Sequence, residues 1–151
     1  MRTPFALLLT GKPNSGKSTL AYALVQKRIR NCLIIDGDKH REMQFLGELG
    51  FSREDILKNN EHVIKLAQFA QDQGFNVIIS QIAPYVEQRD NIRESLKNFY
   101  EVYLDCDEGE RANRPNYVKS ELVYEKGTAN MILNTDFADI DECVGMILEV
   151  L

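Results

Sequence analysis

The sequence predicts an α/β fold of three layers, in which helices cover both faces of a mainly parallel, five-stranded sheet. Two observations lead to this prediction. Short apolar runs alternate with longer helical patterns along the chain of 151 residues, and such alternation is typical of parallel sheets. A glycine-rich loop also separates the first apolar run from the first helical pattern, and loops of this kind bind phosphate groups.

The five apolar runs are the predicted strands, and they lie at Phe5–Leu9, Cys32–Ile35, Phe75–Ser80, Tyr100–Asp105 and Asn130–Leu133. The helical patterns between and after them lie at Lys17–Lys27, Lys39–Leu49, Arg53–Gln73, Val86–Lys97 and Asp139–Leu151. The third pattern is the clearest, because Ser52 suits an N-terminal cap and Gly74 lies where the helix should stop.

Composition predicts one soluble domain over residues 1–151 that binds small molecules. Hydrophobic residues make up 44% and charged residues 27% of the chain, which is ordinary for a globular protein. The formal net charge of -5 argues against a nucleic-acid polymer or an anionic membrane as partner, since both need a basic face. No apolar stretch is long enough to cross a bilayer, so we expect a cytoplasmic protein.

The segment Gly11–Ser18 matches the phosphate-binding pattern G-x-x-x-x-G-K-[S/T], the P-loop. Its glycines let backbone N–H groups surround a phosphate, and the next helix presents its positive end to the same anion. Lys17 should reach the β- and γ-phosphates, and the Ser18 hydroxyl should bind Mg²⁺. The residues of the loop expected to bind ATP are Gly11, Asn14, Ser15, Gly16, Lys17, Ser18 and Thr19.

Two carboxylates and a guanidinium follow the second predicted strand, in the run Asp36-Gly37-Asp38-x-x-Arg41. This edge of an α/β sheet is where ligands bind. A carboxylate here can orient or deprotonate an acceptor hydroxyl or hold Mg²⁺ through water, and an arginine can bind a phosphate or sulfate. One aspartate could instead only cap the next helix. The candidate catalytic residues are Lys17, Asp36 and Asp38, and the candidate metal ligands are Ser18 and Asp36.

The segment 107–128 is polar and fits the alternation of strands and helices poorly. It carries four basic residues, Arg111, Arg114, Lys119 and Lys126. In a kinase of this shape a lid closes charged side chains over the phosphates, so we expect Arg111 and Arg114 to contact ATP. The alternative is a solvated surface helix and loop.

Taken together, the motifs resemble those of adenylylsulfate kinase, a family that uses MgATP to phosphorylate the 3′-hydroxyl of adenosine 5′-phosphosulfate. The resemblance is carried by the loop at 11–19, the Asp-Gly-Asp-x-x-Arg run at 36–41, Leu-Gly-Phe-Ser at 49–52 with Asp55 and Asn59, and Ile-x-Pro-Tyr at 82–85 with Arg89. It implies a P-loop fold of the nucleoside-monophosphate-kinase type and a role in sulfate assimilation, and it is compatible with a homodimer.

The resemblance also implies an acceptor pocket. In the family, the residues that correspond to Arg41, Phe51 and Asn59 line the adenylylsulfate site. A guanidinium suits a phosphosulfate, an aromatic face suits a base and an amide suits polar edges. The full set of predicted acceptor residues is Asp38, Arg41, Phe51, Asn59, Ile82 and Pro84.

Departures from the family pattern fall in the same pocket. Ile56 stands where the family usually has an arginine, and Glu61 and His62 stand where it often has further arginines. Ala83 replaces the serine of the family's Ile-Ser-Pro, which excludes a phosphoserine there. The family's lid motif, Lys-Gly-Leu-Tyr-x-Lys-Ala, has no counterpart after Arg114, so the lid is shortened or altered.

Three hypotheses follow for function. The first is adenylylsulfate kinase itself. The second is a related kinase that phosphorylates a hydroxyl of another nucleotide conjugate or a sugar-like acceptor, as in specialised metabolism or polysaccharide modification. The third is a nucleotide-binding module without activity, against which Lys17, Asp36 and Asp38 argue. We interpret His40 and His62, the two histidines, as surface or supporting residues.

Overall fold

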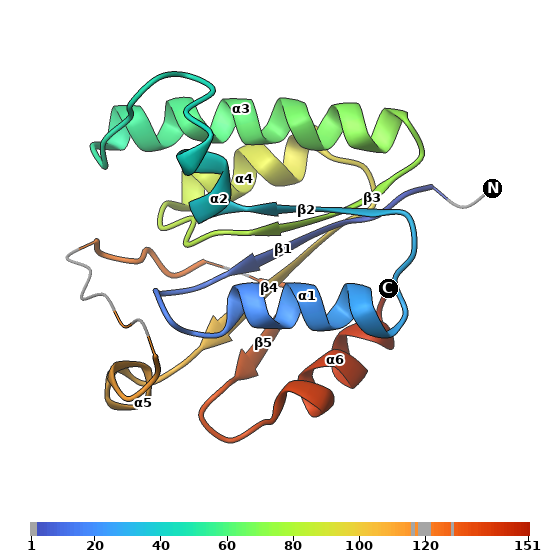
Figure 1. Cartoon of the computed structure of the whole chain (residues 1–151), viewed down its shortest axis with the longest axis vertical. Helices are drawn as coiled ribbons and strands as arrows, with labels where there is room; N and C mark the ends of the chain where they lie inside the picture. Colours follow the sequence, from blue (N-terminus) through green and yellow to red (C-terminus); the bar gives the residue numbers. More distant parts are fainter. Residues whose placement is uncertain (1–2, 116, 118–121, 128) are drawn as a thin grey trace.

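The computed structural model describes residues 3–115, 117, 122–127 and 129–151. Its strands are β1 (Ala6–Thr10), β2 (Cys32–Asp36), β3 (Asn76–Ser80), β4 (Phe99–Asp105) and β5 (Met131–Asn134). Its helices are α1 (Lys17–Lys27), α2 (Gly37–Glu42), α3 (Arg53–Asp72), α4 (Val86–Ser95), α5 (Glu108–Ala112) and α6 (Ile140–Leu148). The sheet lies between α3 and α4 on one face and α1 and α6 on the other (Figure 1), so the predicted three-layer fold is confirmed.

All pairs of neighbouring strands are parallel, and the strand order is β2-β3-β1-β4-β5. Strand β1 is at the centre, where Leu8 pairs with Ile79 of β3 and with Glu101 of β4. Because the strands are parallel, their carboxyl ends all lie at one edge of the sheet. The functional motifs predicted from the sequence follow these carboxyl ends.

Two apolar clusters, one on each face of the sheet, form the core. Along β1 the side chains alternate between them: Leu7 and Leu9 join the cluster that includes α1 and α6, and Ala6 and Leu8 join the cluster beneath α3 and α4. Every residue of β1 is buried. This explains why the strand is a continuous apolar run instead of an alternating one.

The loop after α2 departs from the sequence-based prediction. A helix was expected over Lys39–Leu49, but α2 spans Gly37–Glu42, so that prediction is wrong in both bounds. The chain then turns twice, because Gln44 and Gly47 have φ of 51° and 78°, in the left-handed region that interrupts a helix. The resulting segment, 43–51, is an irregular loop beside the amino end of α3.

The caps predicted for α3 are confirmed. The Ser52 hydroxyl accepts a hydrogen bond from the Asp55 amide at 3.1 Å, as in a capping box. The helix stops before Gly74, which has φ of 87°, a conformation that glycine adopts without strain. The pattern over Arg53–Gln73 therefore gave the helix to within one residue.

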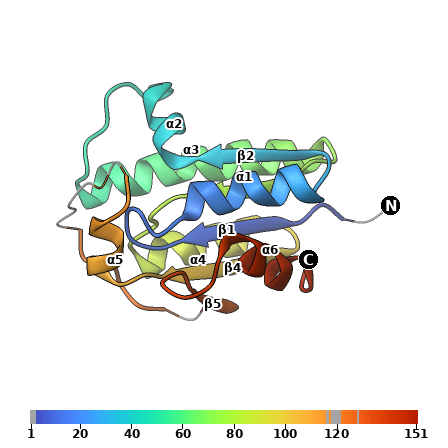
Figure 2. The ribbon, with the colours of Figure 1, turned by 60° about the horizontal axis from the view of Figure 1, so that its bottom comes forward.

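Part of the predicted lid, 107–128, forms the short helix α5, which the sequence analysis did not place. Residues 116, 118–121 and 128 of this segment, Lys119 among them, lie outside the described residues. Figures 1 and 2 both show α5 at the same end of the molecule as the loop that precedes α1. The described start of the segment is therefore near the P-loop.

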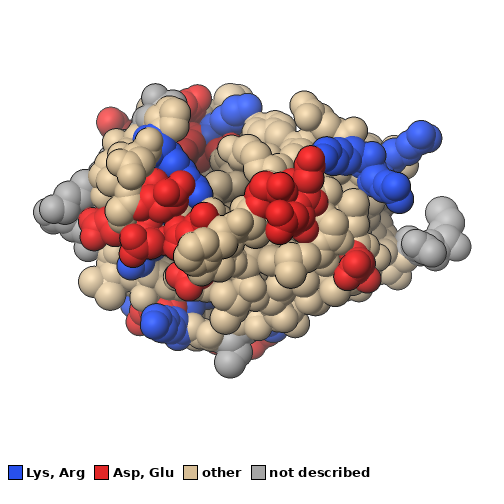
Figure 3. Space-filling view, turned by 90° about the horizontal axis from the view of Figure 1, so that it is seen from below, with Lys and Arg blue, Asp and Glu red and all other residues tan. Residues whose placement is uncertain are grey.

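Figure 3 displays the charged side chains on one face of the molecule. Acidic and basic side chains are interspersed there, and the coloured part of this view has no broad basic area. Within the described ranges no helix is long and apolar enough to cross a membrane. The cysteines Cys32, Cys106 and Cys143 are free thiols.

The packing of α1 on the sheet gives a first prediction. Leu24 of α1 is 0% exposed in the core, whereas Leu33 of β2 is 42% exposed. Replacing Leu24 by Ala should lower the free energy of unfolding by about 2–5 kcal/mol. Replacing Leu33 by Ala should cost less than about 1 kcal/mol. Urea unfolding followed by circular dichroism compares the two variants, and equal losses would contradict the assigned core.

Candidate active site

The P-loop is shaped by two glycines that no other residue could easily replace. Gly16 has φ of 99° and forms the N-cap of α1. Gly11 has φ of 150°, and a Cβ there would lie 2.7 Å from the carbonyl oxygen of Leu104. The loop therefore packs directly on β4 and forms a cradle that leads into the amino end of α1. This cradle fits a phosphate chain.

Lys17 is held at the mouth of this cradle. Its Nζ donates to the carbonyl oxygen of Lys12 at 2.9 Å, and its side chain is 9% exposed. Burial lowers the pKa of Lys17 to about 8. The nearby carboxylates of Asp38 and Asp36 oppose this shift, and the positive charge of Arg111 adds to it. A phosphate placed in the cradle would supply the anion that a buried ammonium group otherwise lacks.

Ser18 faces a second hydroxyl across the site. Its Oγ lies 3.4 Å from the Oγ of Ser80, at the carboxyl end of β3. The sequence analysis missed Ser80, because only the strand order brings residues 18 and 80 together. Among the described residues no cluster of His, Cys, Asp and Glu could bind a metal by itself. The hydroxyl oxygens of Ser18 and Ser80 are ligands of the type that Mg²⁺ accepts, directly or through water, together with substrate phosphates.

The structure gives the two aspartates different positions. The Asp36 carboxylate caps α2, because its Oδ1 accepts hydrogen bonds from the amides of Asp38 at 3.0 Å and Lys39 at 3.4 Å. Asp36 is 8% exposed, whereas Asp38 is exposed on the first turn of α2. Asp38 acts more strongly than Asp36 on the pKa of Lys17. Asp38 is therefore the carboxylate free to meet an acceptor.

Gly37 lets this turn lie against the end of β3. A Cβ at Gly37 would lie 3.0 Å from the Cβ of Gln81 and 3.2 Å from the carbonyl oxygen of Ser80. Both distances are shorter than ordinary van der Waals contacts, so a side chain would push α2 away from the sheet. The glycine thus fixes how closely Asp38 approaches the P-loop.

Both arginines expected to contact ATP lie against the P-loop. Arg111 is 6% exposed and donates to the carbonyl oxygen of Pro13 at 3.3 Å. Arg114 donates to the carbonyl oxygens of Asn14 at 2.9 Å and Thr135 at 2.8 Å. The described start of the predicted lid therefore contacts the loop through arginine side chains, and their charge lies next to the cradle.

The predicted acceptor residues Arg41, Phe51 and Asn59 also lie near one another. The Arg41 guanidinium donates to the carbonyl oxygens of Leu49 and Gly50 and covers the Phe51 ring at 4.4 Å from its centroid. Phe51 is 63% exposed and Asn59 only 7%. An aromatic ring left open to solvent and a buried amide are the reverse of what isolated residues of these types usually show.

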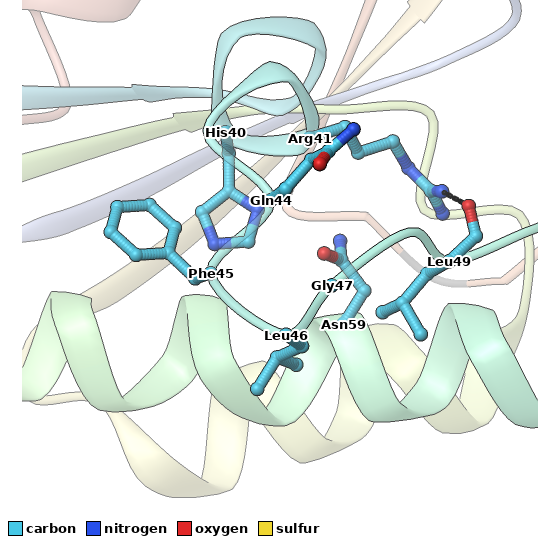
Figure 4. Close-up of a pocket in the computed structure, with 8 residues that line it drawn as sticks. All are labelled: His40, Arg41, Gln44, Phe45, Leu46, Gly47, Leu49 and Asn59. Carbon is cyan, nitrogen blue, oxygen red and sulfur yellow. Dashed lines mark hydrogen bonds between the residues drawn. The ribbon is translucent and has the colours of Figure 1, made fainter.

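Arg41 and Asn59 border a small cavity between α2, the loop 43–51 and α3 (Figure 4). Its volume is about 20 Å³. The lining residues are His40, Arg41, Gln44, Phe45, Leu46, Gly47, Leu49 and Asn59. His40 is 7% exposed, so of its two interpretations the surface position is excluded and the supporting position remains. The sequence analysis did not include it among the candidate site residues.

The remaining acceptor candidates, Ile82 and Pro84, follow β3. The carbonyl oxygen of Ile82 accepts hydrogen bonds from the Thr10 hydroxyl at 2.6 Å and the Gly11 amide at 3.4 Å, and Pro84 is buried. Between them Ala83 has φ of 47°, and Arg89 donates to its carbonyl oxygen at 2.6 Å. This turn is thus joined to the P-loop on one side and to α4 on the other.

The chain is similar to known kinases along most of its length. The family described as adenylylsulphate kinase matches residues 3–143. A cytidine diphosphoramidate kinase of Campylobacter jejuni is 31% identical over 166 aligned residues, which cover 98% of this chain and 96% of that protein. An adenylyl-sulfate kinase of Clostridium acetobutylicum is 32% identical over 164 residues, with 96% and 82% covered.

Solved structures agree in fold. The Mycobacterium tuberculosis APS kinase CysC, solved in complex with AMPPNP and APS, superposes with a TM-score of 0.86. The match covers 99% of this chain and 98% of that chain at 24% identity. A sugar kinase from Janibacter has a TM-score of 0.76 at 17% identity. At these sequence identities the likeness shows a shared fold and does not identify the acceptor.

The different positions of the two aspartates give the second prediction. Asp36→Ala removes the cap of α2 and should lower the free energy of unfolding by about 0.5–2 kcal/mol, whereas Asp36→Asn should retain most of it, since asparagine is a good cap. Asp38→Ala is the matched control and should leave the stability nearly unchanged. Thermal or urea unfolding measures all three, and a loss as large for Asp38→Ala would contradict the assignment.

Proposed function

This chain belongs to the adenylylsulphate kinase family and is a kinase that acts on a hydroxyl group, and we propose that its acceptor is the ribose of a nucleotide conjugate. Cytidine diphosphoramidate is the leading candidate for that conjugate, and adenylylsulfate is the second. The proposal is supported by the charge of the acceptor side of the site, by the identity of residue 56 and by the relatives that the chain matches.

The observation that carries the choice is the shortage of positive charge around the acceptor cavity. Of its eight lining residues, Arg41 alone is an arginine or lysine, and its guanidinium already donates to Leu49 and Gly50. Ile56, where the family usually has an arginine, is 4% exposed in α3. A phosphosulfate, whose terminal oxygens only accept hydrogen bonds, is better matched by several donors. This site suits an acceptor whose terminal group needs fewer hydrogen-bond donors from the protein.

The match over full length supports the same choice. The chain aligns with 96% of the cytidine diphosphoramidate kinase and with 82% of the Clostridium adenylyl-sulfate kinase, at nearly equal identity. Adenylylsulfate stays the second candidate because Arg41, Phe51 and Asn59 keep the family's acceptor residues. The inactive-module hypothesis is disfavoured by the exposed carboxylate of Asp38 beside the P-loop.

In the proposed mechanism the two halves of the site have separate roles. The P-loop amides and Lys17 hold the β- and γ-phosphates of ATP, and Arg111 and Arg114 stabilise the charge that develops on the transferred group. Asp38 orients the ribose hydroxyl and accepts its proton as the oxygen attacks the γ-phosphorus and ADP leaves. Phe51, Ile82 and Pro84 position the base.

The residues present also fit Mg²⁺. The Ser18 hydroxyl would hold it directly, and Ser80 and Asp36 would hold it through water. When bound, Mg²⁺ would supply positive charge that neutralises the phosphate oxygens.

The third prediction separates chemistry from nucleotide binding. Asp38→Asn should lower kcat by about a hundredfold or more, because the amide cannot accept the proton, while the Kd for ATP changes by less than about tenfold. Asp72→Asn, an exposed carboxylate at the end of α3, is the matched control and should behave like the unaltered protein. Steady-state rates and calorimetry decide. Near-normal kcat in Asp38→Asn would remove Asp38 from the mechanism.

The fourth prediction concerns the acceptor. A coupled assay for ADP release should show higher kcat/KM with cytidine diphosphoramidate than with adenylylsulfate, CMP, AMP or free sugars. Arg41→Ala should lower kcat/KM for the preferred acceptor by roughly ten- to two-hundredfold, the effect of one charge-assisted contact of about 1.5–3 kcal/mol. Arg30→Ala, at the opposite edge of the sheet, is the control for loss of charge.

The outcome of the acceptor panel discriminates between the candidates. A clear preference for adenylylsulfate would support the first hypothesis, that the chain is an adenylylsulfate kinase. A preference for a free sugar would reject a nucleotide conjugate altogether.

A further inference from the structure

His40 is a buried histidine whose ring forms part of the wall of the acceptor cavity. It lies on α2 directly before Arg41, and Figure 4 shows its ring and the Arg41 and Asn59 side chains around the same space. The cavity volume of about 20 Å³ is about that of one water molecule or one small terminal group of a ligand. A group that enters it meets His40.

The two ring nitrogens of His40 differ in their partners. Nε2 lies 2.7 Å from Nδ1 of His62, so a single proton is held between the two rings. The Phe45 ring covers this pair, at centroid distances of 5.3 Å from His40 and 4.7 Å from His62. Nδ1 of His40 is buried and has no hydrogen-bond partner of ordinary geometry among the described residues, although the Asn59 amide interacts with the ring. A buried polar atom without a partner is costly, which indicates a ligand or water at this atom.

The surroundings of the ring favour its neutral form. Burial lowers the pKa of His40, and the nearby charges of His62 and Arg41 lower it further, while Asn59 opposes this change. In the tautomer whose Nε2–H donates to His62, Nδ1 carries a lone pair and accepts hydrogen bonds. An arginine offers only donors. The exchange of the family's arginine for His62, paired with His40, therefore adds a ring acceptor beside Arg41, in a pocket where the amides of Gln44 and Asn59 offer both donors and acceptors.

We propose that Nδ1 of His40 accepts a hydrogen bond from the terminal P–NH₂ group of the acceptor and thereby selects a phosphoramidate over a phosphate or a sulfate. This inference rests on the proposed function and names the part of the acceptor that the cavity recognises. The terminal oxygens of an ionised phosphate or sulfate have no hydrogen to donate, so the lone pair of Nδ1 repels them. A P–NH₂ group can donate to Nδ1 while its oxygens accept from Arg41.

The test compares two acceptors that share the base, the ribose and the diphosphate. Cytidine diphosphoramidate ends in NH₂, and CDP ends in an oxygen at the same position. The unaltered protein should prefer the first by about tenfold or more in kcat/KM, and His40→Val should reduce that preference to near unity without changing KM for ATP. Gln71→Val, which replaces a buried polar residue at the far end of α3, is the control and should keep the preference.

Each outcome decides one question. If the unaltered protein phosphorylates both acceptors equally well, or His40→Val keeps the full preference, the role of His40 is overturned and the proposed function stands. If neither cytidine compound is phosphorylated and adenylylsulfate is, the proposed acceptor and this inference both fail.

A measurement on the unaltered protein guards against misfolding of the variant. The chain has two histidines, so ¹⁵N resonances of the imidazole rings are readily assigned. Binding of cytidine diphosphoramidate should move the Nδ1 resonance of His40 toward that of a hydrogen-bonded acceptor nitrogen, and CDP should not. A His40 resonance that stays unchanged with the phosphoramidate overturns the inference.

Discussion

The burial of β1 on both of its faces is the constraint on which the rest of the molecule depends. Because β1 is apolar along its whole length and pairs with β3 and β4, it can only occupy the centre of the sheet. The P-loop that follows it is therefore surrounded by the ends of the neighbouring strands. Ser80 from β3 and Leu104 from β4 contact it directly. A phosphate site in the middle of the edge can then be reached by residues from both sides.

Local features of the chain could be predicted from the sequence. The apolar runs gave all five strands, the Gly11–Ser18 pattern gave the loop, and Ser52 and Gly74 gave the bounds of the longest helix. These features depend on neighbouring residues and on backbone preferences, which the sequence states directly. The loop 43–51 was missed because Gln44 adopts a left-handed conformation that its residue type does not announce. Helix α5 was missed because five residues are too few for a periodic pattern.

The site residues divide in the same way. Lys17, Asp38 and Arg41 were identified because each belongs to a short motif. Ser80 and His40 were not, because their importance arises from partners 62 and 22 positions away in the chain. The sequence also could not say which aspartate caps α2, since that depends on the backbone angles of Asp36. Ser80 could have been identified as a polar residue at the end of β3, the strand next to the one that precedes the P-loop.

The close fit of Gly37 against the end of β3 has a consequence for how this fold changes in evolution. The glycine fixes Asp38 relative to the P-loop, whereas Arg41, His40, Phe51 and Asn59 lie on the stretch of chain that leaves the sheet and returns along α3. Under the proposed mechanism, substitutions on that stretch would alter what is recognised while the distance between the attacking hydroxyl and the phosphorus is kept. One ancestral phosphoryl-transfer centre could thus be inherited unchanged by enzymes that modify chemically different metabolites.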